Sequence, residues 1–127
     1  MNDTSDKPVR RPAALGANAF VVRGGAQRLI ITGQIGIRPD GTVERGLRAQ
    51  LERAFGNLFA VCEAAGFQKN NLVKITTMVT EPGRVLLFRE VRDKALAGHR
   101  CPTVYVQVAG LAAPTLLCEI EAEAVKD

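Results

Sequence analysis

Three glutamates recur at every second position near the C-terminal end of the sequence: Glu119, Glu121 and Glu123. Because alternate residues of a β-strand point to the same face, the segment 116–125 predicts a strand with these carboxylates on one side. Its other side is wholly apolar, with Leu116, Cys118, Ile120, Ala122 and Ala124. Partly desolvated carboxylates can carry out acid–base chemistry. The strand either has one solvated face or lines a polar site.

A second chemical candidate is the pair His99 and Cys101, two residues apart in an expected loop with Arg100 between them. An arginine beside a thiol lowers its pKa, which would favour a Cys–His nucleophile. Against this, the chain has a single histidine, and no Asn or Asp is placed to orient it. Cys62 and Cys118 fall on apolar stripes and are expected to pack in the core. No cysteine has zinc-site spacing, so we expect no structural metal.

The composition is that of an ordinary globular protein, and 127 residues suffice for one domain with its own core. The N-terminus lacks an apolar run, so we expect a cytoplasmic protein without membrane contact. The net charge of +4 comes from scattered arginines, and with no Trp and one Tyr the chain offers few stacking platforms. Nucleic-acid binding is therefore not indicated.

The hydrophobic pattern predicts a tail over residues 1–13 and one domain over 14–127. Within the domain we expect a hairpin, a helix, a strand, a second helix and two final strands. The corresponding ranges are 20–23 with 28–32, 46–65, 72–79, 87–95, 103–108 and 116–125. The order ββαβαββ predicts an α+β fold, with two helices packed on one face of a single mixed sheet.

The expected strand 103–108 alternates, and its apolar residues Val104, Val106 and Val108 are predicted to point inward. The sheet face without helices would carry polar residues mixed with Met78, Leu117 and others, which favours an oligomer that hides part of this face.

Several segments in this order and spacing resemble one family. They are Thr32-Gly33-Gln34-Ile35, Gln50 early in the first helix, Glu63-Ala64-Ala65-Gly66, Leu72-Val73-Lys74-Ile75-Thr76-Thr77, and the run from Val106 to Ala122. Together they are similar to the YjgF/YER057c/UK114 family, also called the RidA (reactive intermediate deaminase) family, over about residues 20–125.

The resemblance implies a chorismate-mutase-like fold in a homotrimer, with clefts between subunits. Characterised members hydrolyse enamines and imines, such as 2-aminoacrylate, to ketoacid and ammonia without cofactor or metal. An arginine near the start of the penultimate strand clamps the substrate carboxylate. A glutamate on the last strand positions or activates water. Some members carry endoribonuclease names.

The arginine position of the family corresponds to Thr103, which has no guanidinium group to bind a carboxylate. Glu119, Gly33 and Gln34 match the family. In this register Thr103 and Tyr105 would face the same side as Glu119 and could donate hydrogen bonds to a ligand. Arg100 either reaches the cleft in compensation or is a solvated surface residue. Glu119 is either the acid/base or a structural carboxylate at the subunit interface. Gly33 and Gln34 either offer backbone N–H groups to a ligand or serve a bend in the strand.

The sequence thus predicts a homotrimeric, RidA-like protein that binds a small metabolite between subunits. The favoured reaction is hydrolytic deamination of an enamine or imine with Glu119 as acid/base, with little activity on 2-aminoacrylate because of Thr103. The alternative is a non-catalytic trimer that binds a metabolite or regulates another pathway. The third hypothesis is a ribonuclease, which predicts strongly salt-dependent RNA binding.

Overall fold

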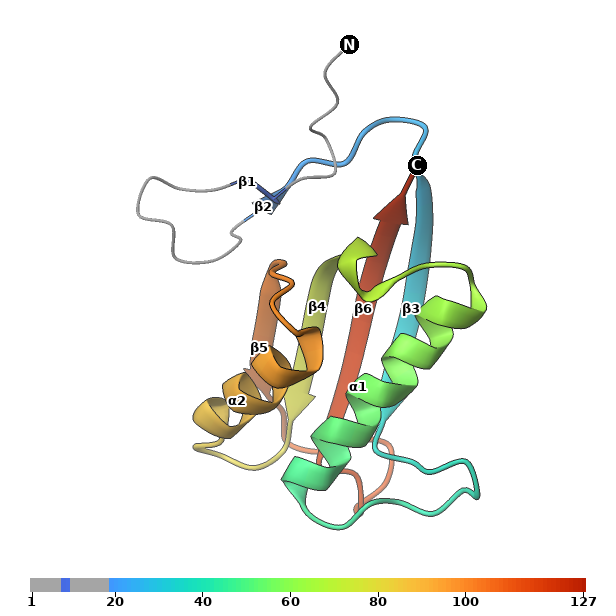
Figure 1. The fold of residues 1–127 in the computed structure, drawn as a ribbon. Coiled ribbons are helices and arrows are strands. Elements are labelled where there is room, and N and C mark those ends of the chain that lie inside the picture. Colours follow the sequence, from blue (N-terminus) through green and yellow to red (C-terminus); the bar gives the residue numbers. More distant parts are fainter. Residues whose placement is uncertain (1–7, 10–18) are drawn as a thin grey trace.

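The computed structural model describes residues 8–9 and 19–127 (Figure 1). The expected tail over residues 1–13 lies outside the described residues, apart from the two residues of β1. The elements are β1 Pro8–Val9, β2 Ala19–Phe20, β3 Gln27–Ile35, α1 Leu47–Ala64, the short 3-10 helix η1 Lys69–Asn71, β4 Leu72–Val79, α2 Val85–Leu96, β5 Thr103–Gln107 and β6 Cys118–Lys126.

Four strands form the main sheet in the order β3-β6-β4-β5. β6 is antiparallel to both of its neighbours, and β4 and β5 are parallel because α2 carries the chain back between them. Both helices cover the same face of the sheet, and the other face is open (Figure 1). The predicted α+β class, a single mixed sheet with two helices on one face, is confirmed.

The hydrophobic core lies between the helices and the sheet. From α1 it takes Leu51, Phe55 and Leu58, which recur at helical spacing and are almost fully buried. From the sheet it takes Ile75 and the apolar side of β6. The predicted apolar face of the last strand is confirmed, since Leu116, Cys118, Ile120, Ala122 and Ala124 are all buried.

The predicted hairpin over 20–32 is wrong in its first strand. Ala26 N–H donates to the Arg23 carbonyl in the expected turn, but residues 21–26 form no strand. Instead, Ala19 and Phe20 pair with Val9 and Pro8, away from β3 (Figure 1). Val21 and Val22 are about half exposed, because no part of the core lies beneath them in this chain.

The predicted orientation of the penultimate strand is also wrong. Val104 and Val106 are 45% and 39% exposed, and they lie on the open face rather than inward. The parallel register places Tyr105 beside the buried Thr77, so Tyr105 points toward the helices, with its ring 5.0 Å from that of Phe88. The prediction took the more apolar side of the strand as the inward side. In β5 the aromatic ring of Tyr105 packs inward, and the valines on the other side remain exposed.

Within the part of the chain that the structure describes, neither helix combines the length and apolar character needed to cross a bilayer.

Candidate functional site

The Glu119 side chain lies directly over Gly33, on the open face of the sheet. The pairing of β3 with β6 shifts between Ile31 and Gln34, so Gly33 occupies an irregularity in the ladder, as expected for a bend. A Cβ atom built on Gly33 would lie only 2.5 Å from the Glu119 carboxyl carbon Cδ. The absence of a side chain at residue 33 therefore makes the space that the Glu119 carboxylate occupies.

Register places apolar side chains next to this carboxylate. Glu119 pairs with Met78 of β4, which in turn pairs with Val106 of β5. Directly paired residues share a face, so these three side chains form a row across the open face. Glu119 itself is half-buried. The candidate acid/base is thus flanked by apolar groups on one side and by backbone at Gly33 on the other.

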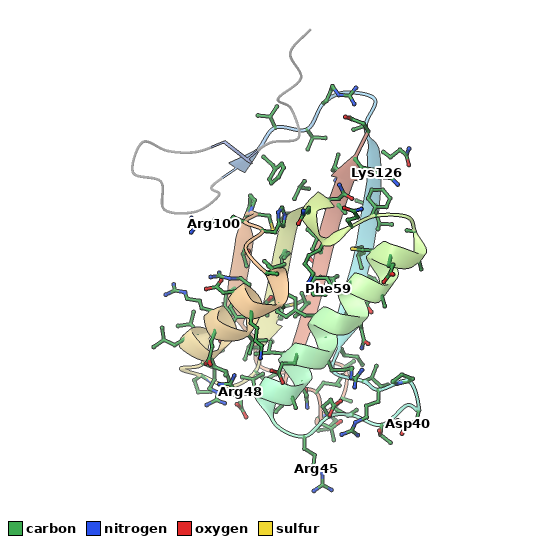
Figure 2. All side chains as sticks on the ribbon, viewed as in Figure 1. Asp40, Arg45, Arg48, Phe59, Arg100 and Lys126 are labelled. Atoms are coloured by element: carbon green, nitrogen blue, oxygen red, sulfur yellow. The ribbon has the colours of Figure 1, made fainter. Side chains whose placement is uncertain are left out.

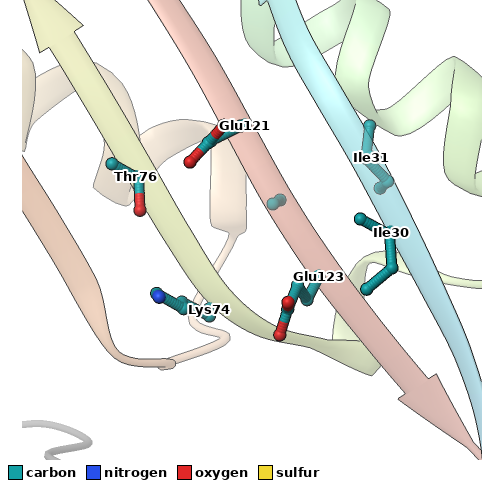
Figure 3. A pocket seen from close by; sticks show the side chains of 7 residues that line it. Ile30, Ile31, Lys74, Thr76, Glu121 and Glu123 are labelled. Atoms are coloured by element: carbon teal, nitrogen blue, oxygen red, sulfur yellow. The ribbon is translucent and has the colours of Figure 1, made fainter.

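The other two glutamates of β6 lie further along the same face (Figure 3). Glu123 accepts a hydrogen bond from Arg28 at 2.8 Å, and Glu121 lies with Lys74 and Thr76 around a shallow hollow of about 110 Å³. The full lining of this hollow is Ile30, Ile31, Lys74, Thr76, Glu121, Ala122 and Glu123. Basic side chains therefore balance part of the negative charge of this face.

Thr103 and Tyr105 do not share the face of Glu119, contrary to prediction. Tyr105 aligns with Thr77 and Ile120, whereas Glu119 aligns with Met78 and Val106. The Thr103 hydroxyl donates to the Cys101 carbonyl at 3.1 Å. The Tyr105 hydroxyl is buried and has no hydrogen-bond partner among the described residues, and burial raises the pKa of its phenol. Within one chain, neither residue can act together with Glu119.

Arg100 and Gln34 have separate surroundings. Arg100 is exposed and precedes β5 (Figure 2). β5 begins opposite Ile75, while Glu119 lies opposite Met78 near the far end of β4, so Arg100 and Glu119 lie toward opposite ends of the sheet. The Gln34 amide donates to the Thr32 carbonyl of its own strand at 3.1 Å.

The structure does not support the Cys–His nucleophile. A ring nitrogen of His99 is 2.7 Å from the Leu72 carbonyl oxygen, which holds the ring against β4. Cys101 is buried, and burial raises the pKa of its thiol to about 11. A thiol with this pKa is protonated near neutral pH and is a poor nucleophile.

Gln50 has a positioning role that the sequence analysis did not assign. Its buried side chain donates to the carbonyls of Glu44 and Thr115 and accepts from Leu117 N–H, all within 3.0 Å. It thereby joins the start of α1 to the loop that leads into β6, two residues before Glu119. A polar residue on the apolar stripe of α1 was the available signal, since buried amides need partners.

Comparison with known proteins identifies the family. The model of the endoribonuclease L-PSP family matches residues 9–126. A RutC family protein of Pyrococcus horikoshii is 30% identical over 118 residues, covering 91% of this chain and 92% of that protein. For a RutC family protein of Aquifex aeolicus, the match is 36% identical over 66 residues and spans about half of each chain (51% and 50%).

Among solved structures, RidA from the Antarctic bacterium Psychrobacter sp. PAMC 21119 superposes with a TM-score of 0.74 at 30% identity, covering 97% of this chain and 98% of that one. The fold, the family model and the relatives agree along nearly the whole sequence. The chain therefore belongs to the endoribonuclease L-PSP family, the YjgF/RidA family that its sequence motifs resemble.

Proposed function

We propose that this protein binds a small polar or anionic metabolite in clefts between the subunits of a homotrimer. There it hydrolyses an enamine or imine, with Glu119 as the acid/base. The observation that carries the proposal is the half-buried Glu119 carboxylate in the space left by Gly33. A glycine that would collide with this carboxylate if it had a side chain indicates that the position of Glu119 matters.

The chemistry needs one group that both takes and gives a proton. A carboxylate beside the imine carbon accepts a proton from the attacking water, and the oxygen bonds to carbon. The same carboxyl group then returns the proton to nitrogen, which gives a carbinolamine. In a second transfer the carboxylate accepts the hydroxyl proton and passes it to the amine nitrogen, the C=O bond forms as the C–N bond breaks, and ketone and ammonia leave. The register places the apolar side chains of Met78 and Val106 in the same row as this carboxylate, where they limit the water around it.

The open face supports assembly of several copies. Ile30 is 61% exposed, and Val104 and Val106 are also well exposed on the same face. Large apolar side chains left exposed on an uncovered sheet face favour an interface with another chain. In such an assembly a cleft receives residues from two subunits, so the separation of Thr103 and Arg100 from Glu119 within one chain does not exclude a common site.

The non-catalytic alternative is favoured by two observations. Thr103 supplies no charged group, and within the described residues no Lys or Arg is hydrogen-bonded to Glu119. A metabolite-binding trimer without turnover would fit this arrangement. The ribonuclease hypothesis gains nothing from the open face, where three glutamates of β6 would repel phosphates.

The test is release of ammonia from enzymatically generated 2-iminopropionate and 2-iminobutyrate. We expect little activity of the wild type on these carboxylates and a gain in Thr103→Arg. In that background Glu119→Gln should lower the rate by about 100-fold or more. Glu121→Gln is the matched control, because it makes the same change on the same strand and face. Inactivity of both wild type and Thr103→Arg would favour the non-catalytic alternative.

A further inference from the structure

A second concave site lies on the other side of the molecule, between the two helices. Its floor is apolar and comes from Phe55 and Phe59 of α1 and Val91 and Ala95 of α2. The remaining lining residues are Glu52, Gly56, Lys69 and Lys94. The volume of about 330 Å³ is within the range of small-molecule sites. Because the helices cover one face of the sheet and Glu119 lies on the other, this groove is separate from the candidate active site (Figure 1).

Gly56 keeps the groove open. It lies in the interior of α1, where glycine costs about 1 kcal/mol relative to alanine. A Cβ atom built there would meet nothing within 4 Å, so no close packing requires the glycine. A larger side chain at this position would project into the groove between the helices. The glycine therefore leaves its part of the groove unfilled.

Two lysines give the groove a positive rim. The Lys69 ammonium is held over the face of the Phe59 ring, 4.3 Å from its centroid. Lys94 is exposed on α2, and within the described residues no ion pair engages it. The carboxylate of Glu90 is bonded to Arg48 at 3.0 Å. Glu52 also lines the groove and offsets part of the positive charge, so the lining carries two lysines and one glutamate.

An aromatic and aliphatic floor with cationic groups at the rim complements one kind of molecule. We propose that this groove binds a small carboxylate with an apolar body, such as an aryl-substituted short-chain acid. The apolar body packs on Phe55 and Phe59, and the carboxylate lies between Lys69 and Lys94. Figure 2 shows Phe59 projecting from α1 on the helical side of the molecule, where the ligand would contact it.

The test uses 3-phenylpropionate as the probe and 3-phenylpropan-1-ol as its neutral counterpart. Titration of the full chain, followed by NMR amide shifts and calorimetry, should show saturable binding with a dissociation constant in roughly the millimolar range or tighter. The shifted amides should belong to α1, η1 and α2. The alcohol should bind about 2- to 5-fold more weakly, which is the contribution of an exposed charge pair.

Variants separate filling of the groove from loss of fold. Gly56→Leu should abolish binding, while Gly56→Ala, which adds one methyl group and favours the helix, should retain it. Lys94→Gln should weaken binding of the acid and narrow its advantage over the alcohol, while Lys69 keeps the remainder. Lys74→Gln, the same change on the open face, should leave it unaltered. Circular dichroism establishes that each variant is folded.

Three results with the wild type would overturn the proposal. They are the absence of saturable binding of the acid, equal binding of acid and alcohol, or amide shifts confined to the open face near Glu119. Undiminished binding by a folded Gly56→Leu variant would also contradict it. None of these outcomes depends on the deaminase activity, so this proposal and the proposed function fail independently.

Discussion

The two faces of the sheet differ in how much of their apolar surface one chain buries. On the covered face, α1 and α2 bury a continuous apolar layer, and residues such as Leu51, Ile75 and Ile120 have no exposure. On the open face, Ile30, Val104 and Val106 remain exposed beside charged side chains. A single chain thus buries the apolar side chains on one side of the sheet and leaves several of them exposed on the other.

This difference in burial predicts separate roles for the two faces, one in stability and the other in assembly and turnover. The covered face contains the contacts that fold the chain, and the buried amide of Gln50 is hydrogen-bonded within it. The open face contains Glu119, the candidate acid/base, together with the apolar surface that a second copy would cover. We therefore expect substitutions on the covered face to change the free energy of unfolding, and substitutions on the open face to change assembly and turnover.

Adjacent isoleucines on β3 test this contrast with the same chemical change. Ile31 is 3% exposed toward the helices, and Ile30 is 61% exposed on the open face. Ile31→Ala should lower the free energy of unfolding by about 2–5 kcal/mol through lost burial and a cavity. Ile30→Ala should lower it by less than about 1 kcal/mol in dilute protein. Urea unfolding at low protein concentration measures both, and equal losses would remove the distinction between the faces.

Gly33→Ala should displace the Glu119 side chain from its position over residue 33. The new Cβ atom would lie 2.5 Å from Glu119 Cδ, so the carboxylate must move. We expect a loss of about 1–3 kcal/mol from overpacking, together with loss of turnover. Gly24→Ala is the matched control, because nothing lies within 4 Å of its Cβ position. A double-mutant cycle with Glu119→Ala should recover much of the stability, and strictly additive losses would show that the two residues are not in contact.

The buried thiols of Cys101 and Cys118 predict a loss of stability in alkali. Burial raises the pKa of Cys101 to about 11 and that of Cys118 to about 12. The unfolded chain releases these protons near pH 9 and the folded chain holds them, so the unfolded state binds fewer protons above that pH. Stability should fall by about 1 kcal/mol per pH unit for each thiol between pH 9 and 11.

Unfolding of the wild type beside Cys118→Ala at pH 8, 9 and 10 measures this slope. The variant should show a shallower decline than the wild type. Identical slopes would mean that the thiol of Cys118 is not responsible for the loss.

The smallest effect should come from the ion pair between the helices. Arg48 of α1 and Glu90 of α2 are 3.0 Å apart, and both are more than half exposed. Arg48→Gln should change the free energy of unfolding by only about 0.2–1 kcal/mol, and less at high salt. Thermal unfolding at two ionic strengths measures the change, and a salt-independent loss of several kcal/mol would point to a packing role.

The covered face could be predicted from the sequence because its hydrophobic pattern arises from burial against a single core. Period-2 alternation in residues 116–125 and 3.6-residue spacing in α1 both follow from burial on one side. The helix from 46 to 65 and the strand from 72 to 79 accordingly match Leu47–Ala64 and Leu72–Val79. Of the two roles expected for Gly33, the register shift between Ile31 and Gln34 agrees with the bend, and glycine inside a strand commonly marks such an irregularity. Ligand binding at Gly33 stays a prediction.

The open face could not be predicted by the same reasoning. Val104 and Val106 are apolar although no helix covers them, so hydrophobicity alone assigned β5 to the wrong orientation. This error in turn placed Thr103 and Tyr105 on the side of Glu119. Similarly, the apolar Phe20-Val21-Val22 was assigned to a strand beside β3, although Ala19–Phe20 pairs with Pro8–Val9. Hydrophobicity in a single sequence does not distinguish a strand face that packs in the core from one that stays exposed in the single chain.

The most direct test of assembly through the open face is sedimentation equilibrium of the wild type beside Val106→Glu. We predict that the wild type has three times the 13.7 kDa mass of one chain, and that the variant has the mass of one chain with an unchanged far-UV spectrum. Ala60→Glu, on the exposed side of α1, should leave the mass of the wild type unaltered. A wild type that remains at the mass of one chain at high concentration would contradict the account.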